Sequence, residues 1–439
     1  MNWRDQALHL QQPPDWDPAT NQHKTKGFPI PLRISGAKVS MSISEVAMKA
    51  IQRVAKQIRG QICLTCAVIS LLAGSSVSQS DIAANWHQFH YAANGTRLNP
   101  RETVLNPETV PELKLKWHFK TGSFIYSSPA VVDGVVYIGS GDHNVYALNA
   151  STGKRIWKYR TGAYVLYTSP AVVGGVVYIG SWDDNVYALK ADTGGKVASF
   201  TTGYFVDSSP AVTDGVVYIG SSDGNLYALN AANLSKIWSF DAAPGEVTDN
   251  PAVVEGVVYI SSGYNVCAVN ASTGDELWDV TTDGIVTSSP TVADGVVYVG
   301  WYDSVYALNA KTGDQLWSYT TNGYIGPSSA AVAKGVVYVG SHDNNVYALD
   351  AKTGEKLWSY ATNGIVGSSP AVADGVVYVG SEDNNIYALN AETGAYLWSY
   401  TTGDPIDSSP TVVNGMLYVG SEDANVYAFG LPASSEEEK

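Results

Sequence analysis

The chain has 439 residues, is 45% hydrophobic and carries a formal net charge of -15 from 26 basic and 41 acidic residues. The acidic excess lies beyond residue 80, because residues 1–80 hold more Lys and Arg than Asp and Glu. A body this acidic is not expected to bind nucleic acid or an anionic membrane surface through charge. The length alone would suggest two or three domains, but an internal repeat joins most of the chain into one.

The first 80 residues differ from the rest of the chain. Residues 1–47 show no apolar periodicity, which predicts an unstructured extension or a start codon assigned too far upstream. Residues 48–80 contain basic residues, then the apolar run 62–74, then small polar residues. This order is typical of a secretory signal peptide, and the run is too short to span a membrane. We therefore expect export to a periplasmic, cell-surface or extracellular location.

A repeat of about 40 residues fills residues 113–430. Each copy has four strand-like runs rich in Val, Ile, Tyr and Trp, separated by tight turns. The first turn has glycine second in a two-residue loop, the second turn is of the type Gly-Ser-x-Asp-x-Asn, and the third is Thr-Gly. Eight copies predict an all-β, eight-bladed propeller of four-stranded antiparallel blades. The landmark tyrosine of the second strand recurs at Tyr137, Tyr178, Tyr218, Tyr259, Tyr298, Tyr338, Tyr378 and Tyr418.

The two ends of the repeat region predict how the ring closes. The last copy has three strands and then runs into residues 431–439, an acidic tail expected to be disordered. A surplus strand, Leu113 to Gly122, precedes the first complete copy. It is expected to supply the fourth strand of the last blade, so that no strand edge is left open.

A tryptophan closes the fourth strand of each copy except one, where Ala198 stands in its place. The segment Ala-x-Asp-x-x-Thr-Gly-x-x-x-Trp that ends at Trp358 resembles the tryptophan-docking motif of the pyrroloquinoline-quinone (PQQ) repeat family. The lead-in segment, residues 81–112, resembles the one that precedes the ring in quinoprotein dehydrogenases. The resemblance implies that the tryptophans form a structural girdle between blades: Trp117, Trp157, Trp238, Trp278, Trp317, Trp358 and Trp398.

The resemblance implies two possible functions. Quinoprotein alcohol dehydrogenases use PQQ, Ca²⁺, an adjacent Cys-Cys disulfide and a catalytic aspartate, whereas other members, such as the propeller of the outer-membrane β-barrel assembly machinery, are noncatalytic. This chain has no Cys-Cys pair, and its copies are too alike for a dedicated catalytic set. We expect a noncatalytic binding or assembly scaffold without a cofactor; a PQQ- and Ca²⁺-dependent dehydrogenase is the alternative.

The cysteines and histidines predict no metal site. Cys63 and Cys66 lie inside the apolar run, so no redox or zinc role is expected. Cys267 replaces a recurring strand tyrosine and is expected to be a buried core residue without a disulfide partner. The seven His residues show no metal-ligand spacing.

Differences between the copies concentrate in the link from the fourth strand to the next first strand and in the second turn. Both connections should emerge on one face of the ring, around the channel mouth, where a monomeric propeller could bind a protein, a peptide or a carbohydrate. The alternative is that these are ordinary solvated loop residues. The recurring aspartate of the second turn is expected to form the turn, because a catalytic residue would not recur in most copies. The candidate residues of this face are Tyr126, Tyr164, Tyr167, Trp182, Tyr204, Asp207, Glu246, Asp249, Trp301, Tyr302, Tyr324, His342, Glu382 and Glu422.

Overall fold

The computed structural model describes residues 85–242 and 245–432. By its contacts the chain divides into residues 1–78 and 79–439, and every described residue belongs to the second unit. The predicted extension, signal peptide and acidic tail lie outside the described residues. Within the described part of the chain, no helix has the length and apolar character needed to cross a membrane.

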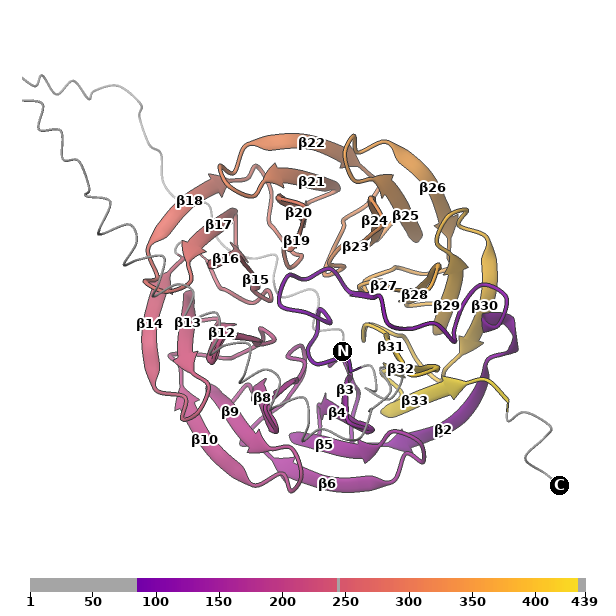
Figure 1. Cartoon of the computed structure of the whole chain (residues 1–439), viewed down its shortest axis with the longest axis horizontal. Helices are drawn as coiled ribbons and strands as arrows, with labels where there is room; N and C mark the ends of the chain where they lie inside the picture. The colour runs from indigo at the N-terminus through magenta and orange to yellow at the C-terminus, as the bar shows by residue number, and fades with distance from the viewer. Residues whose placement is uncertain (1–84, 243–244, 433–439) are drawn as a thin grey trace, which may run out of the picture. The chain divides into compact units, whose positions relative to one another are not determined.

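The second unit is a ring of eight β-sheets, as predicted (Figure 1). Each blade has four antiparallel strands, and the strands of blades 1 to 4 follow one another in chain order. They are β3 (Ala130–Val132), β4 (Val135–Ser140), β5 (Asn144–Asn149) and β6 (Arg155–Arg160); β7 (Ala171–Val173), β8 (Val176–Gly180), β9 (Asn185–Lys190) and β10 (Lys196–Thr201); β11 (Ala211–Thr213), β12 (Val216–Gly220), β13 (Asn225–Asn230) and β14 (Lys236–Asp241); β15 (Ala252–Val254), β16 (Val257–Ser262), β17 (Asn265–Asn270) and β18 (Glu276–Thr281).

Blades 5 to 8 complete the ring, and blade 7 carries a fifth strand, β1, parallel to its first strand. A single 3-10 turn, η2 (Val110–Glu112), precedes β2. The strands are β19 (Thr291–Ala293), β20 (Val296–Trp301), β21 (Ser304–Asn309) and β22 (Gln315–Thr320); β23 (Ala331–Ala333), β24 (Val336–Gly340), β25 (Asn345–Asp350) and β26 (Lys356–Ala361); β27 (Ala371–Ala373), β28 (Val376–Gly380), β29 (Asn385–Asn390), β30 (Tyr396–Thr401) and β1 (Leu98–Asn99); β31 (Thr411–Val413), β32 (Met416–Gly420), β33 (Asn425–Gly430) and β2 (Lys114–Lys120).

Local sequence explains both the strands and their turns. The second and third strands of each blade are almost wholly buried, which suits their runs of Val, Ile, Leu and Tyr, whereas exposed residues alternate along the fourth strand. In the first turn of blade 1, Asp133 and Gly134 both have positive φ, 49° and 74°, as a tight hairpin turn requires. The predicted turn chemistry is confirmed.

The ring closes as the sequence predicts. β2, from the front of the repeat region, pairs antiparallel with β33 at its end, with His118 opposite Tyr427 and Phe119 opposite Val426. The last blade therefore has strands from both ends of the ring. This pairing removes the strand edge that an open last blade would expose.

The tryptophans of the fourth strands join each blade to the next. The indole Nε1 of Trp358, for example, donates to the carbonyl of Ala391 at 3.0 Å, and its ring lies on Gly394, where an added Cβ would come within 2.7 Å of it. Glycine in the third turn is therefore required by contact as well as by its positive φ. The same indole-to-carbonyl bond is made by Trp117, Trp157, Trp238, Trp278, Trp317 and Trp398.

The two departures from this pattern lie against each other. Ala198 pairs with Ala188 as Trp157 pairs with Ala147, so it occupies the tryptophan position of blade 2. In blade 3 the third-turn glycine is replaced by Leu234, which is 2% exposed and packs in the same hydrophobic cluster as Ala198. The leucine side chain therefore fills the space that the missing indole leaves, and it does so with a positive φ of 56°.

A closed ring of hydrogen bonds lies near the start of the first strands. The backbone N–H of one residue per blade donates to the side chain of its counterpart in the next blade, and seven of these eight residues are serines. The bonds run from Ser128 to Ser169, Ser209, Asn250, Ser289, Ser329, Ser369, Ser409 and back to Ser128.

The lead-in segment, from residue 85 on, crosses the middle of the ring (Figure 1, indigo) and contacts every blade. In blade 8 the amide of Asn99 donates to the carbonyl of Val412 at 2.8 Å. In the other blades a first-strand N–H donates to the segment, which satisfies backbone groups that would otherwise face the channel. These pairs are Val131–Trp86, Val172–His87, Val212–Gln88, Val253–Ala93, Val292–Asn94, Val332–Thr96 and Val372–Arg97.

Arg97 anchors this segment inside the ring. Its side chain is fully buried, and its guanidinium donates to the carbonyls of Pro370 at 2.7 Å, Pro410 at 2.9 Å and Phe89. It also lies 4.7 Å from the centre of the Phe89 ring. Burial lowers the pKa of Arg97 to about 9, which still leaves it charged near neutral pH. The charge is held by backbone carbonyls of blades 7 and 8 and of the lead-in segment.

Candidate functional site

The strand directions place the links and the second turns on one face, the upper face, and the first and third turns on the other, the lower face. On the upper face each second turn lies against the link that precedes its blade. The N–H of Trp182 donates to the carbonyl of Tyr164 at 2.9 Å, and the N–H of His342 donates to that of Tyr324 at 2.7 Å. The two variable parts of the repeat therefore lie side by side.

The recurring aspartate of the second turn organises this face. Asp183 accepts the Tyr187 hydroxyl at 2.6 Å, the Asn185 backbone N–H at 3.2 Å and the N–H of Gly162 in the link. Side-chain and backbone hydrogen bonds hold the pKa of the equivalent Asp343 below its usual value despite its burial. The same set of bonds recurs at Asp142, Asp223, Asp343, Asp383 and Asp423, which confirms the turn-forming role.

Aromatic side chains form a continuous group over blades 1 to 3. The ring of Trp182 is stacked on Phe205 with centroids 5.0 Å apart and lies edge-on to Tyr164 at 5.8 Å. Phe205 stacks in turn on Tyr204, at 4.1 Å. Tyr164 and Tyr204 are 41% and 48% exposed, so this group presents aromatic surface to solvent.

Two further aromatic groups lie on the upper face. Tyr126 and Tyr167, on the links before blades 1 and 2, stack with centroids 5.1 Å apart, and Tyr167 is 54% exposed. Over blades 5 and 6, Tyr302 lies edge-on to Tyr324 at 4.8 Å, and Tyr324 lies 6.3 Å from the ring of His342. Both groups come from links and second turns.

Trp301 was predicted for this face, but it does not belong to its exposed surface. The second turn of blade 5 is one residue shorter than that of blade 1, and Trp301 takes the strand-end position of the buried Ser140. It pairs with Ser304 as Ser140 pairs with Asn144. The indole then turns inward, stacks on Tyr306 and donates to Asp283 at 3.1 Å. Trp301 is only 5% exposed.

The carboxylates predicted for this face lie in two environments. Glu246 is exposed, whereas Glu382 and Glu422 are partly exposed in the second turns of blades 7 and 8. The Asp207 carboxylate accepts a hydrogen bond from the Nε1–H of Trp182. Burial raises the pKa of Asp207 to about 6, and the nearby Glu246 raises it further. Acidic residues with raised pKa values, placed at a channel mouth, are more common at functional sites than elsewhere.

Blade 4 departs most from the repeat, at Asp249, which was predicted for this face, and at Ser261, which was not. Asp249 stands where the other links have Ser or Thr, and it accepts the hydroxyl of Ser261 at 2.9 Å. Ser261 itself replaces the glycine that the other blades have at or next to the end of the second strand. Burial raises the pKa of Asp249 to about 7. Aligning the eight copies column by column would have paired these two replacements.

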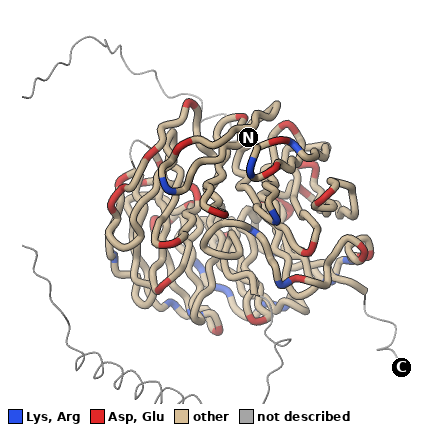
Figure 2. Tube along the Cα trace, turned by 45° about the horizontal axis from the view of Figure 1, so that its top comes forward, with Lys and Arg blue, Asp and Glu red and all other residues tan. Residues whose placement is uncertain are grey.

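The connections of the upper face carry only negative formal charges. The described links and second turns contain many Asp and Glu residues and no Lys or Arg. Acidic positions also predominate in the ring as a whole (Figure 2). A cationic ligand would therefore be favoured on this face, and an anionic one would be repelled.

The described residues do not fit the quinone cofactor of the dehydrogenases. PQQ is a tricarboxylate, and no Lys or Arg of the upper-face connections is present to hold it. The buried cation Arg97 already donates to backbone carbonyls. Among residues 85–242 and 245–432, no group of three or more His, Cys, Asp or Glu side chains could hold a metal ion. Cys267, a free and buried thiol as predicted, is a core residue.

This architecture defines the class of protein: a propeller of PQQ-like repeats. Residues 163–249, 235–364 and 343–431 match the family described as outer membrane protein assembly factor BamB, and the chain belongs to that family. Residues 86–166 also match the family described as the β-propeller domain of glucose, ethanol and alcohol dehydrogenases.

Individual relatives fall into the same two groups. The 1-butanol dehydrogenase (cytochrome c) of Thauera butanivorans is 33% identical over 113 residues, which are 25% of this chain and 14% of the relative. The quinohemoprotein alcohol dehydrogenase of Comamonas testosteroni superposes with a TM-score of 0.69 at 17% identity, covering 80% of this chain and 82% of the other. BamB of Moraxella catarrhalis superposes with a TM-score of 0.63 at 19% sequence identity, and the match covers 73% of this chain and 100% of the other. At these identities the superpositions show the fold alone.

Proposed function

We propose that the protein is an exported, noncatalytic scaffold whose upper face binds an extended, basic segment of a partner protein. The observation that carries the proposal is the composition of that face, where exposed tyrosines and carboxylates occur together without Lys or Arg in the connections. Carboxylates pair with Lys and Arg side chains, and aromatic rings attract the same cations. The family description, an outer membrane protein assembly factor, supports a role in holding other proteins.

The aromatic group over blades 1 to 3 is the expected centre of the contact. Tyr164, Trp182 and Tyr204 come from consecutive links and turns and are held by ring contacts at 4.1–5.8 Å through Phe205. A surface fixed in this way loses little side-chain entropy on binding. Aromatic residues of this kind supply most of the binding energy in many protein interfaces.

A peptide titration tests the proposal. A fluorescent decapeptide rich in Arg and Lys should bind saturably in low salt and about tenfold more weakly in high salt, because salt screens exposed charges. Tyr204→Ala should weaken binding at least fivefold without changing the melting temperature. Tyr396→Ala is the matched control, since Tyr396 is 52% exposed on β30, outside the upper-face connections. Equal effects of the two variants, or equal binding of an acidic decapeptide, would contradict the proposal.

The dehydrogenase alternative has its own support, because residues 86–166 match a dehydrogenase propeller domain and the four curated relatives are alcohol or quinate/shikimate dehydrogenases. Purified protein is incubated with PQQ and Ca²⁺ and assayed for dye-linked alcohol oxidation. Saturable binding with turnover would replace the scaffold proposal. Neither is expected, because the acidic connections of the upper face would repel a tricarboxylate.

A further inference from the structure

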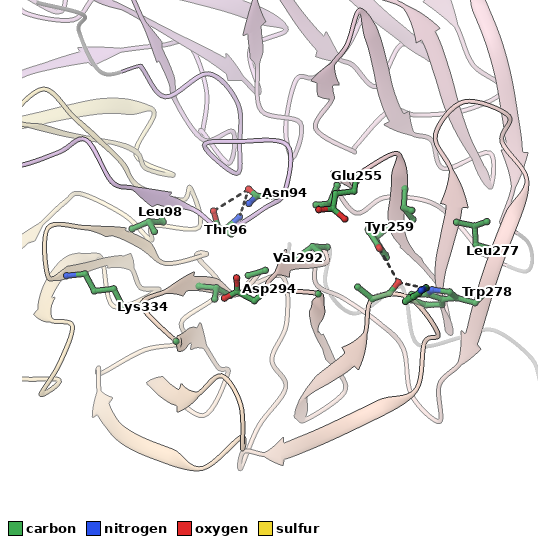
Figure 3. Close-up of a pocket in the computed structure, with 18 residues that line it drawn as sticks. Asn94, Thr96, Leu98, Glu255, Tyr259, Leu277, Trp278, Val292, Asp294 and Lys334 are labelled. Atoms are coloured by element: carbon green, nitrogen blue, oxygen red, sulfur yellow. Dashed lines mark hydrogen bonds between the residues drawn. The ribbon is translucent and has the colours of Figure 1, made fainter. Parts of the chain in front are cut away.

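A cavity of about 860 Å³ is lined by the first turns of blades 4 to 6 and therefore lies on the lower face. Figure 3 shows the residues that line it. The lead-in segment forms one wall, through Asn94, Thr96 and Leu98. The blades contribute apolar side chains, among them the buried Val292 and Val332. The volume falls in the usual range of ligand-binding sites, about 300–1,000 Å³.

The chain covers the corresponding surface of blades 7 and 8 with its own residues. Glu102 Oε2 accepts the N–H of Gly415, in the first turn of blade 8, at 2.9 Å. Val104 packs on the same glycine, and Leu105 is fully buried. Pro107 lies on Gly375, in the first turn of blade 7, where an added Cβ would be 3.6 Å away. Residues 102–107 therefore bridge two neighbouring first turns with an acidic side chain followed by apolar ones.

The first turns of blades 5 and 6 carry no such cover within the described chain. A Cβ added to Gly295 or Gly335 would meet nothing within 4 Å, although both glycines line the cavity. The repeat makes these turns equivalent to those of Gly375 and Gly415. The cavity is thus an unfilled counterpart of a surface that elsewhere in the same ring holds an extended chain segment.

The charges at the rim add specificity. Lys334 is exposed and is the only basic residue among the first turns of the eight blades. Glu255 and Asp294, on the first turns of blades 4 and 5, are exposed at the other side of the opening (Figure 3). An occupant with a carboxylate beside Lys334 and a cation toward Glu255 and Asp294 would be complementary to the rim.

We propose that this cavity is a second docking site, which binds an extended peptide segment of a partner with an acidic residue followed by branched apolar residues and proline. The chain's own segment 101–108, Arg-Glu-Thr-Val-Leu-Asn-Pro-Glu, has this chemistry and occupies the equivalent surface of blades 7 and 8. The site is independent of the upper face. A single propeller could therefore hold two segments at once, one basic and one apolar with an acidic residue.

The experiment uses the full chain and a blocked, fluorescent octapeptide with the sequence of residues 101–108. Saturable one-to-one binding is expected, and Lys334→Glu should weaken it about tenfold. Lys154→Glu is the matched control, because Lys154 is exposed after the third turn of blade 1, outside the cavity lining. A peptide with lysine in place of its first glutamate, the one that corresponds to Glu102, should bind the Lys334→Glu variant better than the parent protein. A merely structural role of Lys334 would not produce this result.

Three results would overturn the proposal. One is the absence of saturable binding to the folded parent protein, and another is equal binding of a scrambled octapeptide. The third is binding that Lys334→Glu leaves unchanged, which would indicate that the peptide displaces the chain's own segment from blades 7 and 8. Failure of this experiment leaves the upper-face titration unaffected, because the two probes and the two sets of variants differ.

Discussion

The pair formed by Ala198 and Leu234 allows a quantitative test of how the blades are joined. Ala198→Trp with Leu234→Gly would restore the tryptophan and glycine that the other junctions have. Each single substitution should destabilise the ring, whereas the double variant should be close to the parent. The introduced indole would donate to the carbonyl of Ala231, which accepts the Tyr178 hydroxyl at 2.8 Å.

The magnitudes follow from burial and backbone conformation. Removing the side chain of Leu234, which is 2% exposed, should cost about 2–5 kcal/mol. Relief of its positive φ returns about 1–2 kcal/mol. Ala198→Trp alone would overpack the junction at a cost of about 1–3 kcal/mol. Since the double variant should lie within about 1 kcal/mol of the parent, the coupling free energy between the two positions is about 3 kcal/mol.

Urea unfolding of the four proteins gives the double-mutant cycle. The reverse exchange at the preceding junction, Trp157→Ala with Gly194→Leu, is the matched control and should show coupling of the same sign. Additive effects of Ala198→Trp and Leu234→Gly would refute the reasoning, because they would mean that the two side chains do not share one space.

Three further outcomes are expected. Deletion of Leu113 to Gly122 should abolish cooperative thermal unfolding followed by circular dichroism, because β33 loses its partner; a deletion that melts like the parent would contradict the closure. Arg97→Met should lower the free energy of unfolding in urea by about 3 kcal/mol or more, since buried carbonyls lose their donor, and an unchanged midpoint would contradict this. The folded state holds a proton on Asp249 up to about pH 7, so this group lowers stability as pH rises from about 4 to 7. Asp249→Ser should therefore raise stability at pH 8 by about 1–2 kcal/mol and leave it unchanged at pH 3, in parallel urea titrations; a gain at pH 3 alone would be inconsistent with the shift.

The fold could be predicted because its signals are repeated. A single Asp-Gly turn or Val-Val-Tyr strand is a weak signal of fold, but eight copies at nearly constant spacing indicate a propeller. The unequal ends of the repeat region predicted the pairing of β2 with β33. The coupling of Ala198 with Leu234 was not predicted, although Ala198 departs from the repeat in the sequence. Their contact depends on how the fourth strand of one blade meets the third turn of the next, and spacing within a copy does not show this.

The candidate face was predictable in position and less so in detail. Variation between copies located the links and second turns, but it could not tell which aromatic side chains face solvent. Trp301 shows why, since the shorter turn places it at the strand-end position that Ser140 has in blade 1, where its indole stacks on Tyr306. The hydrogen bond from Ser261 to Asp249 joins the second strand of blade 4 to the link before it, and both residues replace recurring ones, so a comparison of the eight copies would have paired them.

The lead-in segment has a consequence for how this protein can evolve. It supplies a hydrogen-bonding partner to each blade in turn, from Trp86 in blade 1 to Asn99 in blade 8. The length of the segment therefore matches a ring of eight blades. Duplication of a 40-residue copy would be easy for the gene, yet a ninth blade would find no partner on a segment of fixed length. Two features of the chain therefore determine the number of blades: the number of repeat copies and the length of the lead-in segment.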